Sequence, residues 1–190
     1  MKKIFTLLTV ALISTAAMAQ STWKVDKAHS RLQFTITHLL VSDVDGRFKD
    51  FDATIVASKP DFSDAKVTLI AQTASVDTDN ERRDTHLKSA DFFDVTKNPT
   101  MNFTSTGITP AGAGKYKLTG NLTLNGVTKP VTLDFWHRGT IPGTGNKKDN
   151  AGFKVTGSIK RSDFNFGKTF GAATLSDEVE IIANGEFAKS

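Results

Sequence analysis

Residues 115–138 read KYKLTGNLTLNGVTKPVTLDFWHR, and apolar and polar side chains alternate on both sides of Asn125-Gly126. Successive side chains of a β-strand point to opposite faces, so each arm of this segment has one apolar and one polar face. Asn-Gly accepts the positive φ angles of a type I′ turn, which reverses a strand within two residues. Pro130 lacks a backbone donor and suits an edge, a strand start or a bulge. The segment therefore predicts an antiparallel hairpin.

The same alternation recurs along most of the chain. It predicts further strands at 23–26, 29–38, 48–57, 65–76, 100–106, 153–161 and 178–187. Ser42–Gly46 predicts a turn, and the parity of Phe48 predicts a bulge near Lys49-Asp50. About eight half-apolar strands with short connections indicate an all-β fold, either a closed antiparallel barrel or a sandwich. A barrel of this size either fills with side chains or holds one small ligand.

One short segment, at about 79–93, replaces the strand pattern with a helical signal. Thr78 and Glu81 have the spacing of a capping box, in which the hydroxyl caps the helix start and the carboxylate reaches back. We expect a helix from Glu81 to Ser89, followed by a second turn that ends at Phe93.

Residues 1–19 have the layout of a cleaved secretory signal peptide. Lys2 and Lys3 precede an apolar run, and Ala17–Ala19 forms an A-x-A cleavage site. The apolar run is too short to span a bilayer, so we expect no permanent membrane anchor. Residues 20–190 then form one domain, which is large enough for a substantial core. We expect an exported, periplasmic protein.

The composition excludes several classes of site. Cysteine is absent, which excludes disulfides, thiolate zinc sites and thiol nucleophiles. The formal net charge of +4 includes the two signal-peptide lysines, and charges of both signs are interspersed along the chain. We therefore expect no nucleic-acid partner. The four histidines lack H-x-H or HExxH spacing and no GxSxG motif is present, so we expect no metal, no cofactor and no catalytic residues.

Several motifs spread over residues 20–190 point to one family. The most specific are Ser75-Val76-Asp77-Thr78, Arg83-Asp84-x-His86-Leu87 and Asp91-Phe92-Phe93-Asp94, supported by Trp23-x-Val25-Asp26-x-x-His29-Ser30, Gly46-x-Phe48, Gly120-x-Leu122-Thr123-Leu124-x-Gly126-Val127-Thr128-x-Pro130-Val131 and Arg161-x-Asp163-Phe164. This set resembles the YceI family of exported polyisoprenoid-binding proteins. Asn165-Phe166 departs from the Asp-Phe-Gly that the family often has near its end. The resemblance implies a lipocalin-like barrel with a helix beside it, a long isoprenoid-type lipid inside it, no catalytic activity and, as an option, a homodimer.

The apolar faces supply the expected lipid site, with an ordinary packed core as the alternative. Eight side chains would point into one barrel: Leu32, Phe34, Ile36, Leu122, Leu124, Phe135, Phe153 and Val155. With 14 Phe and 1 Tyr, the chain offers a large apolar area and few ring hydroxyls that need a partner. Apolar attraction is not directional, so we expect binding to tolerate different chain lengths.

Polar residues near the ends of these faces are candidates for contact with a lipid headgroup. The candidates are His38, His137, Arg161, Arg82, Arg83 and His86. Arginine forks recognise phosphate and carboxylate groups in a two-pronged manner. The alternatives are satisfied rim groups, a metal pair made by two histidines, and internal pairs with Asp84, Asp91 or Asp94 that tie the helix to the barrel.

We therefore expect a protein that sequesters or transports a polyisoprenoid or a similar long-chain amphiphile and is not an enzyme. One rival is a filled barrel, structural or stress-related, that acts only through surface partners. The other is a histidine-dependent metal protein or hydrolase. Ser30 lies beside His29, but adjacent strand residues face opposite ways and make a poor nucleophile and base.

Overall fold

The hairpin around Asn125-Gly126 forms as the alternation predicts. In the computed structural model, which describes residues 20–190, β7 (Lys115–Leu124) pairs with β8 (Val127–Ile141) in antiparallel register. Asn125 has φ 50° and Gly126 has φ 72°, which are the positive angles of a type I′ turn. β8 pairs with β9 only from Asp134 onward, so Pro130 lies on a locally free edge. The signal peptide predicted for residues 1–19 lies outside the described residues.

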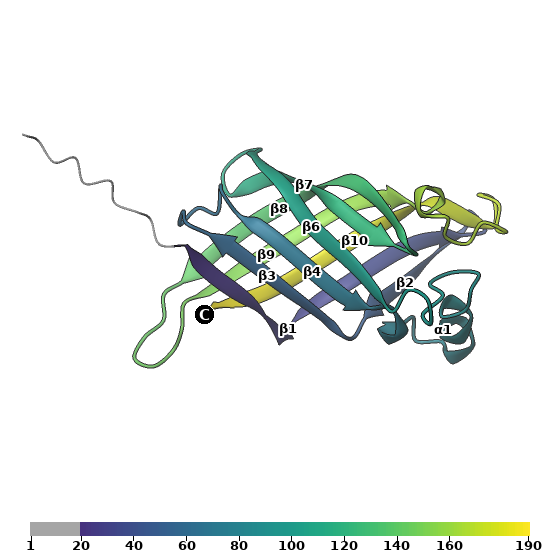
Figure 1. Ribbon diagram of the computed structural model, residues 1–190, viewed down its shortest axis with the longest axis horizontal. Coiled ribbons are helices and arrows are strands. Elements are labelled where there is room, and N and C mark those ends of the chain that lie inside the picture. The colour runs from purple at the N-terminus through teal and green to yellow at the C-terminus, as the bar shows by residue number, and fades with distance from the viewer. Residues whose placement is uncertain (1–19) are drawn as a thin grey trace, which may run out of the picture.

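Eight strands close into a ring (Figure 1). The remaining members are β1 (Ser21–His38), β3 (Phe51–Ala57), β4 (Lys66–Gln72), β6 (Thr100–Pro110), β9 (Asn150–Lys160) and β10 (Leu175–Lys189). Their order is β10-β9-β8-β7-β6-β4-β3-β1, and β1 pairs with β10 to complete the circle. Every one of these pairings is antiparallel. The predicted all-β barrel of about eight strands is confirmed, and the sandwich is not formed.

Two short strands lie outside the ring, and they show that the predicted turn at Ser42–Gly46 and the predicted bulge near Lys49-Asp50 are wrong. Ser42–Gly46, predicted as a turn, belongs to β2 (Ser42–Phe48), which pairs with the second half of β1. The chain actually reverses at residues 39–41, with positive φ at Leu39 and Leu40. The bulge predicted near Lys49-Asp50 is instead the bend between β2 and β3. β5 (Val76–Asp77) adds to the outer edge of β2.

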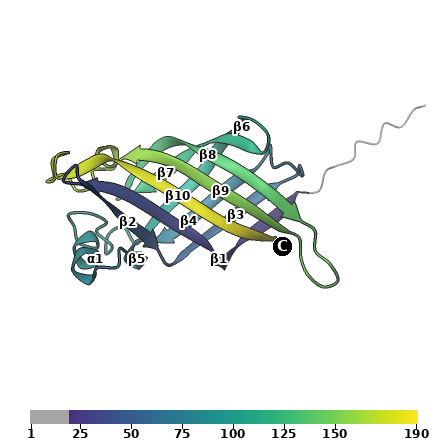
Figure 2. The same ribbon diagram turned by 180° about the vertical axis from the view of Figure 1, so that it is seen from behind.

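The described residues contain one α-helix, α1 (Glu81–Leu87), and two 3-10 turns, η1 (Thr73–Ser75) and η2 (Arg161–Phe164). The predicted cap at Thr78 is wrong, because Asn80 caps the helix and its side chain accepts a hydrogen bond from the Arg83 amide. α1, the β1–β2 hairpin and the loop that follows η2 gather at one end of the barrel (Figures 1 and 2). The C-terminus and the β8–β9 loop lie at the opposite end.

The barrel end that carries the C-terminus is closed by aromatic rings. Phe62, from the loop between β3 and β4, packs its ring 5.3 Å from Trp23 and 4.8 Å from Phe153. Phe153 in turn lies 5.3 Å from Phe135 and 5.4 Å from Phe187. All five side chains are buried, so this half of the barrel is a packed core. None of the helices between residues 20 and 190 is long and apolar enough to cross a membrane.

Candidate ligand-binding cavity

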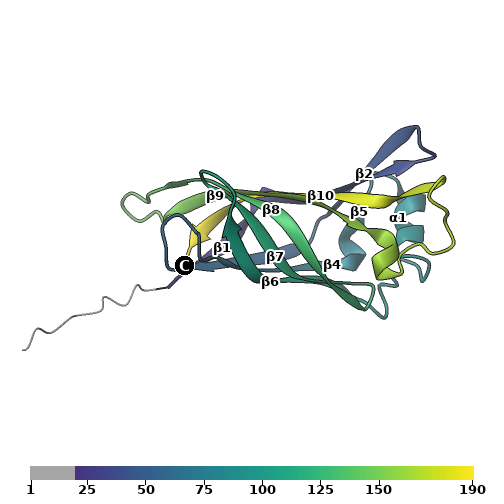
Figure 3. The ribbon, with the colours of Figure 1, turned by 90° about the horizontal axis from the view of Figure 1, so that it is seen from above.

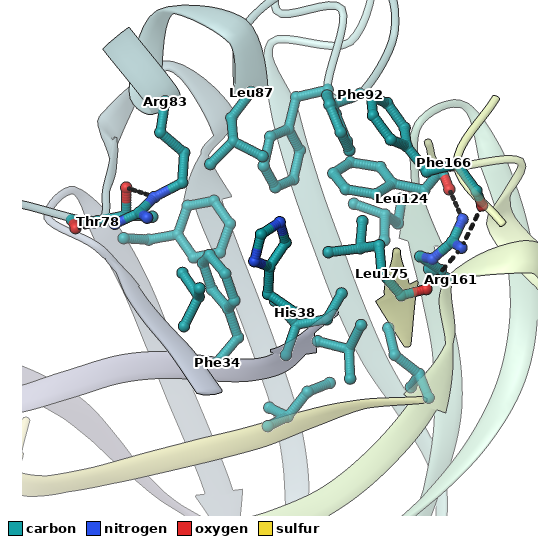
Figure 4. A pocket seen from close by; sticks show the side chains of 18 of the residues that line it. Phe34, His38, Thr78, Arg83, Leu87, Phe92, Leu124, Arg161, Phe166 and Leu175 are labelled. Carbon is teal, nitrogen blue, oxygen red and sulfur yellow. Dashed lines mark hydrogen bonds between the residues drawn. The ribbon is translucent and has the colours of Figure 1, made fainter. Parts of the chain in front are cut away.

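The other half of the barrel is hollow. A cavity of about 290 Å³ lies below α1, between the barrel wall and the segments that cover this end (Figure 4). Most of its wall is apolar, and sixteen of its side chains are Leu32, Phe34, Ile36, Val44, Phe48, Leu87, Phe92, Phe93, Met101, Leu124, Ile159, Phe166, Phe170, Leu175, Val179 and Ile181. The volume is comparable with the smaller pockets that bind small molecules, which run from about 300 to 1,000 Å³.

The structure separates the eight predicted interior residues into two groups. Leu32, Phe34, Ile36 and Leu124 line the cavity. The others lie outside its lining: Leu122, Phe135 and Phe153 are buried in the packed core, and Val155 packs against that core. All eight lie in the cavity lining, in the packed core or against that core, but only half of them meet open space.

Four phenylalanines that the sequence analysis did not assign to the interior form the roof of the cavity. Phe93 packs 4.6 Å from Phe166 between ring centroids, and Phe92 stacks on Phe170 at 5.3 Å. They come from the turns after α1 and from the loop after η2, so strand alternation could not indicate them. In the sequence, Phe92 and Phe93 stand out only in the Asp91-Phe92-Phe93-Asp94 motif and at the end of the predicted helical turn, and neither feature indicates that they face the interior.

Arg161 organises the loop that follows η2. Its side chain is buried, and all five of its N–H groups donate to backbone carbonyls, some of which Figure 4 shows. The acceptors are Phe166, Gly167, Phe170, Leu175 and Ser176, at 2.6–3.2 Å. No donor of this guanidinium remains for a headgroup, so Arg161 fits the alternative of a satisfied rim group.

The predicted headgroup candidates on α1 are Arg82, Arg83 and His86, and they differ in their hydrogen bonds and in whether they reach the cavity. Arg83 donates from Nε to the Thr78 hydroxyl and from Nη2 to the Thr78 carbonyl, both at 2.7 Å. That hydroxyl donates to Asp84 at 2.6 Å, which ties the helix to the end of β5. Arg83 and His86 still reach the cavity wall, whereas Arg82 is exposed and forms no ion pair with any of residues 20–190. His86 pairs with Asp91 at 3.0 Å.

His38 is the polar side chain that stands most openly at the cavity. Its ring points into the space between the strands and the roof (Figure 4). Among the described residues no hydrogen bond to this ring is formed. Arg83 also lines the cavity, and its Nη1 has no hydrogen-bond partner among them either. His38 and Arg83 therefore keep unused hydrogen-bonding capacity at the wall of a mostly apolar chamber.

His137, the other predicted rim histidine, lies at the opposite end, in the aromatic core. Its ring is 4.5 Å from Phe62, and its Nε2 bonds the Thr140 hydroxyl at 2.9 Å. Burial lowers the pKa of His137 below its ordinary value, so the ring is neutral near pH 7. His38 and His137 therefore do not form a metal pair.

His29 also lies outside the cavity lining. Its Nδ1 pairs with Asp26 at 2.8 Å, and Glu186 lies close enough for the three to form a group of potential ligands. Ser30 instead exchanges hydrogen bonds with the backbone of Glu186. His29 and Ser30 thus have different partners and do not form a nucleophile–base pair.

Comparison with known proteins identifies relatives over nearly the whole described chain. The model of the YceI-like domain matches residues 23–187. Protein YceI of Salmonella newport is 42% identical over 179 residues, which cover 92% of this chain and 91% of the relative. The crystal structure of a Campylobacter jejuni YceI protein superposes with a TM-score of 0.73 at 38% identity, covering 81% of this chain and 89% of that one.

A more distant structure shares the fold alone. A polyisoprenoid binding domain from Saccharophagus degradans superposes with a TM-score of 0.65 at 13% identity. The match covers 90% of this chain and all of that domain.

Proposed function

The chain belongs to the YceI-like domain family, and from this premise we propose that it is an exported protein that binds a long-chain isoprenoid or similar amphiphile in the cavity below α1. The observation that carries the proposal is the cavity itself, an apolar chamber walled by strands and roofed by phenylalanines. The fold shared with the polyisoprenoid binding domain of S. degradans supports the same class of ligand. Export to the periplasm is proposed from the signal peptide predicted for residues 1–19.

The attraction for the ligand is the removal of its hydrocarbon chain from water. Each buried methylene contributes roughly 0.8 kcal/mol, so a few isoprene units are enough for tight binding without any ionic contact. The apolar roof and wall demand no specific orientation along the chain. The ligand class is therefore defined by an apolar tail of limited width rather than by a particular functional group.

The polar end of the ligand has a defined place in this proposal. His38 and Arg83 both line the cavity and keep unused hydrogen-bonding capacity, and the His38 ring points into the open space. A hydroxyl or phosphate at the end of the tail would meet them, whereas Arg161 has no donor left to offer. No step of this proposal requires a bond to be made or broken, so the protein acts as a binder and not as an enzyme.

A matched pair of substitutions on β10 tests the proposal. Val179 lines the cavity, and the next residue, Glu180, is exposed on the outer face. Val179→Trp would occupy the space that the lipid needs, whereas Glu180→Trp adds the same side chain outside the barrel. Wild type, both variants and a mock purification are extracted with organic solvent, and the lipid recovered per mole of folded protein is measured by mass spectrometry.

We expect a long-chain lipid in the wild type and in Glu180→Trp, and strong depletion in Val179→Trp. Circular dichroism and the melting temperature establish that the variants fold. A wild type without lipid, even after incubation with a prenyl alcohol in detergent, would refute the proposal. So would equal lipid content in the two folded tryptophan variants.

A further inference from the structure

Three large aliphatic side chains stand in solvent at the tip of the β1–β2 hairpin. Leu39 is 52% exposed, Leu40 is 70% exposed and Val41 is 83% exposed. The hairpin projects from the barrel end that carries α1 and the cavity (Figure 3). Consecutive exposed aliphatic residues at a projecting tip are unfavourable in water and indicate contact with another apolar phase.

The backbone of this tip gives no reason for leucine. Leu39 has φ 52° and Leu40 has φ 61°, in the left-handed region where Gly, Asn and Asp are favoured. A polar turn residue would adopt these angles more easily and would be better solvated. The apolar side chains therefore serve something other than the turn.

A second uncharged segment lies beside the tip. Residues 169–176 (TFGAATLS) contain no ionisable side chain, and the Leu39 amide donates to the Thr174 carbonyl at 3.0 Å. Behind the tip, His38 pairs with Leu175 across the sheet, and both line the cavity. The exposed tip, the uncharged segment and the cavity wall are therefore adjacent in the structure.

We propose that this surface, the tip at residues 39–41 together with residues 169–174, docks on a phospholipid bilayer, with the tip inserted among the acyl chains. The inference rests on the proposed function, because a lipid cargo must pass between a membrane and the cavity without exposing its tail to water. Three side chains on a narrow hairpin are far too few for a stable protein–protein interface, which needs roughly 800 Å² from each partner. They suffice for shallow anchoring at a membrane surface. Lys168 and Arg82, exposed at the same end, suit the headgroup region.

Vesicle binding tests the tip directly. The wild type and the double variant Leu40→Asp/Val41→Asp are sedimented with vesicles of phosphatidylethanolamine and phosphatidylglycerol. Ile141→Asp is the matched control, because Ile141 is 74% exposed at the opposite end of the barrel. All three substituted side chains are exposed, so the melting temperatures should stay unchanged. We expect the affinity of the tip variant for vesicles to fall by about tenfold or more, and the control to bind like the wild type.

Lipid transfer separates this inference from the proposed function. Each protein is offered a labelled prenyl alcohol, first in detergent and then in the same vesicles. If the tip docks on the bilayer, the tip variant loads like the wild type from detergent but much more slowly from vesicles. Equal transfer from vesicles by both proteins, or no sedimentation of the wild type, overturns the inference. Failure of every protein to load from detergent refutes the lipid cargo, and the sedimentation result then decides the docking surface by itself.

Discussion

Arg161 brings a full positive charge into the rim of the cavity and forms no ion pair with any acidic side chain of residues 20–190. Its guanidinium is satisfied by five carbonyls of residues 166–176, the segment that also supplies Phe166 and Phe170 to the roof. A rigid planar group with five donors can serve carbonyls that lie in several directions at once. Arg161 therefore holds the roof of the cavity in place.

Arg161→Lys should lower the free energy of unfolding by about 2 to 4 kcal/mol, because one ammonium cannot reach all five carbonyls and several are left unpaired. Chemical denaturation measures the loss, and hydrogen exchange should accelerate in residues 165–176. Arg82→Lys, on the exposed face of α1, serves as the control and should have no effect. A loss no larger than that of the control would contradict the role assigned to Arg161.

Asp77 forms pH-dependent ion pairs with Arg47 and Lys49 at the same end of the molecule. Lys49 and Arg47, whose nitrogens lie 2.9 and 2.7 Å from its carboxylate, hold its pKa at about 2 instead of 3.8. A lowered carboxyl pKa contributes stability above the unfolded value, and this contribution is lost as the pH falls through the folded value. Asp77→Asn should therefore be less stable than the wild type at neutral pH, and the difference should shrink between pH 3.8 and about 2.

Urea titrations of the wild type and Asp77→Asn over this pH range measure that difference. Asp52→Asn, on the outer face of β3, controls for the loss of one negative charge. A stability difference that stays constant down to pH 2 would show that the carboxylate is not titrating as the two cations require.

At the scale of elements, glycine marks the turn of the β7–β8 hairpin but not the turn of the β1–β2 hairpin. Asn125-Gly126 indicates its turn correctly, because the positive φ angles need those residues. Gly46 suggests a turn but lies within β2, opposite Phe34, where a Cβ would come within 2.2 Å of the Phe34 ring. The glycine makes room for a ring that lines the cavity. The true reversal at Leu39-Leu40 carries no turn signal, so the sequence could not place it.

The alternation on β7 predicts which side chains point into the barrel, but not how far along the barrel axis the cavity extends. Leu122 and Leu124 share the inner face of the strand and are equally buried, yet only Leu124 reaches the cavity. Which inner residues meet open space depends on how far along the barrel axis the aromatic rings extend, and those rings come from five separate parts of the chain. Local periodicity contains no such information, and this is why half of the predicted interior residues lie in the packed core.

Leu122→Asp should therefore affect stability without affecting the site. An unpaired charge in the packed core should lower the free energy of unfolding by about 3 to 5 kcal/mol. The lipid bound per mole of protein that remains folded should be unchanged, since Leu122 lies outside the lining. Asn121→Asp, on the outer face of the same strand, is the control. An unaltered melting temperature, or selective loss of lipid from folded protein, would show that Leu122 is misplaced.

At the scale of the whole molecule, the barrel is closed at one end and hollow at the other. Phe62 contributes most to this asymmetry, because it enters the barrel from a loop and contacts Trp23, His137 and Phe153. Phe62 lies between the predicted strands 48–57 and 65–76, and strand alternation cannot indicate that a residue of the connecting loop fills the interior. The cavity is consequently a blind pocket of about 290 Å³ and not a tunnel through the barrel.

A blind pocket limits how much of a ligand can be buried. In a series of prenyl alcohols of increasing length, affinity should rise with each unit while the added methylenes enter the cavity, by roughly 0.8 kcal/mol for each one buried. Beyond the length that fills the pocket, further units remain outside and the dissociation constant should level off. Displacement of a fluorescent fatty probe measures this series at fixed detergent concentration. If affinity instead rises through the longest chains, the aromatic core must open to admit them, and the closed end described here would be only one state of the barrel.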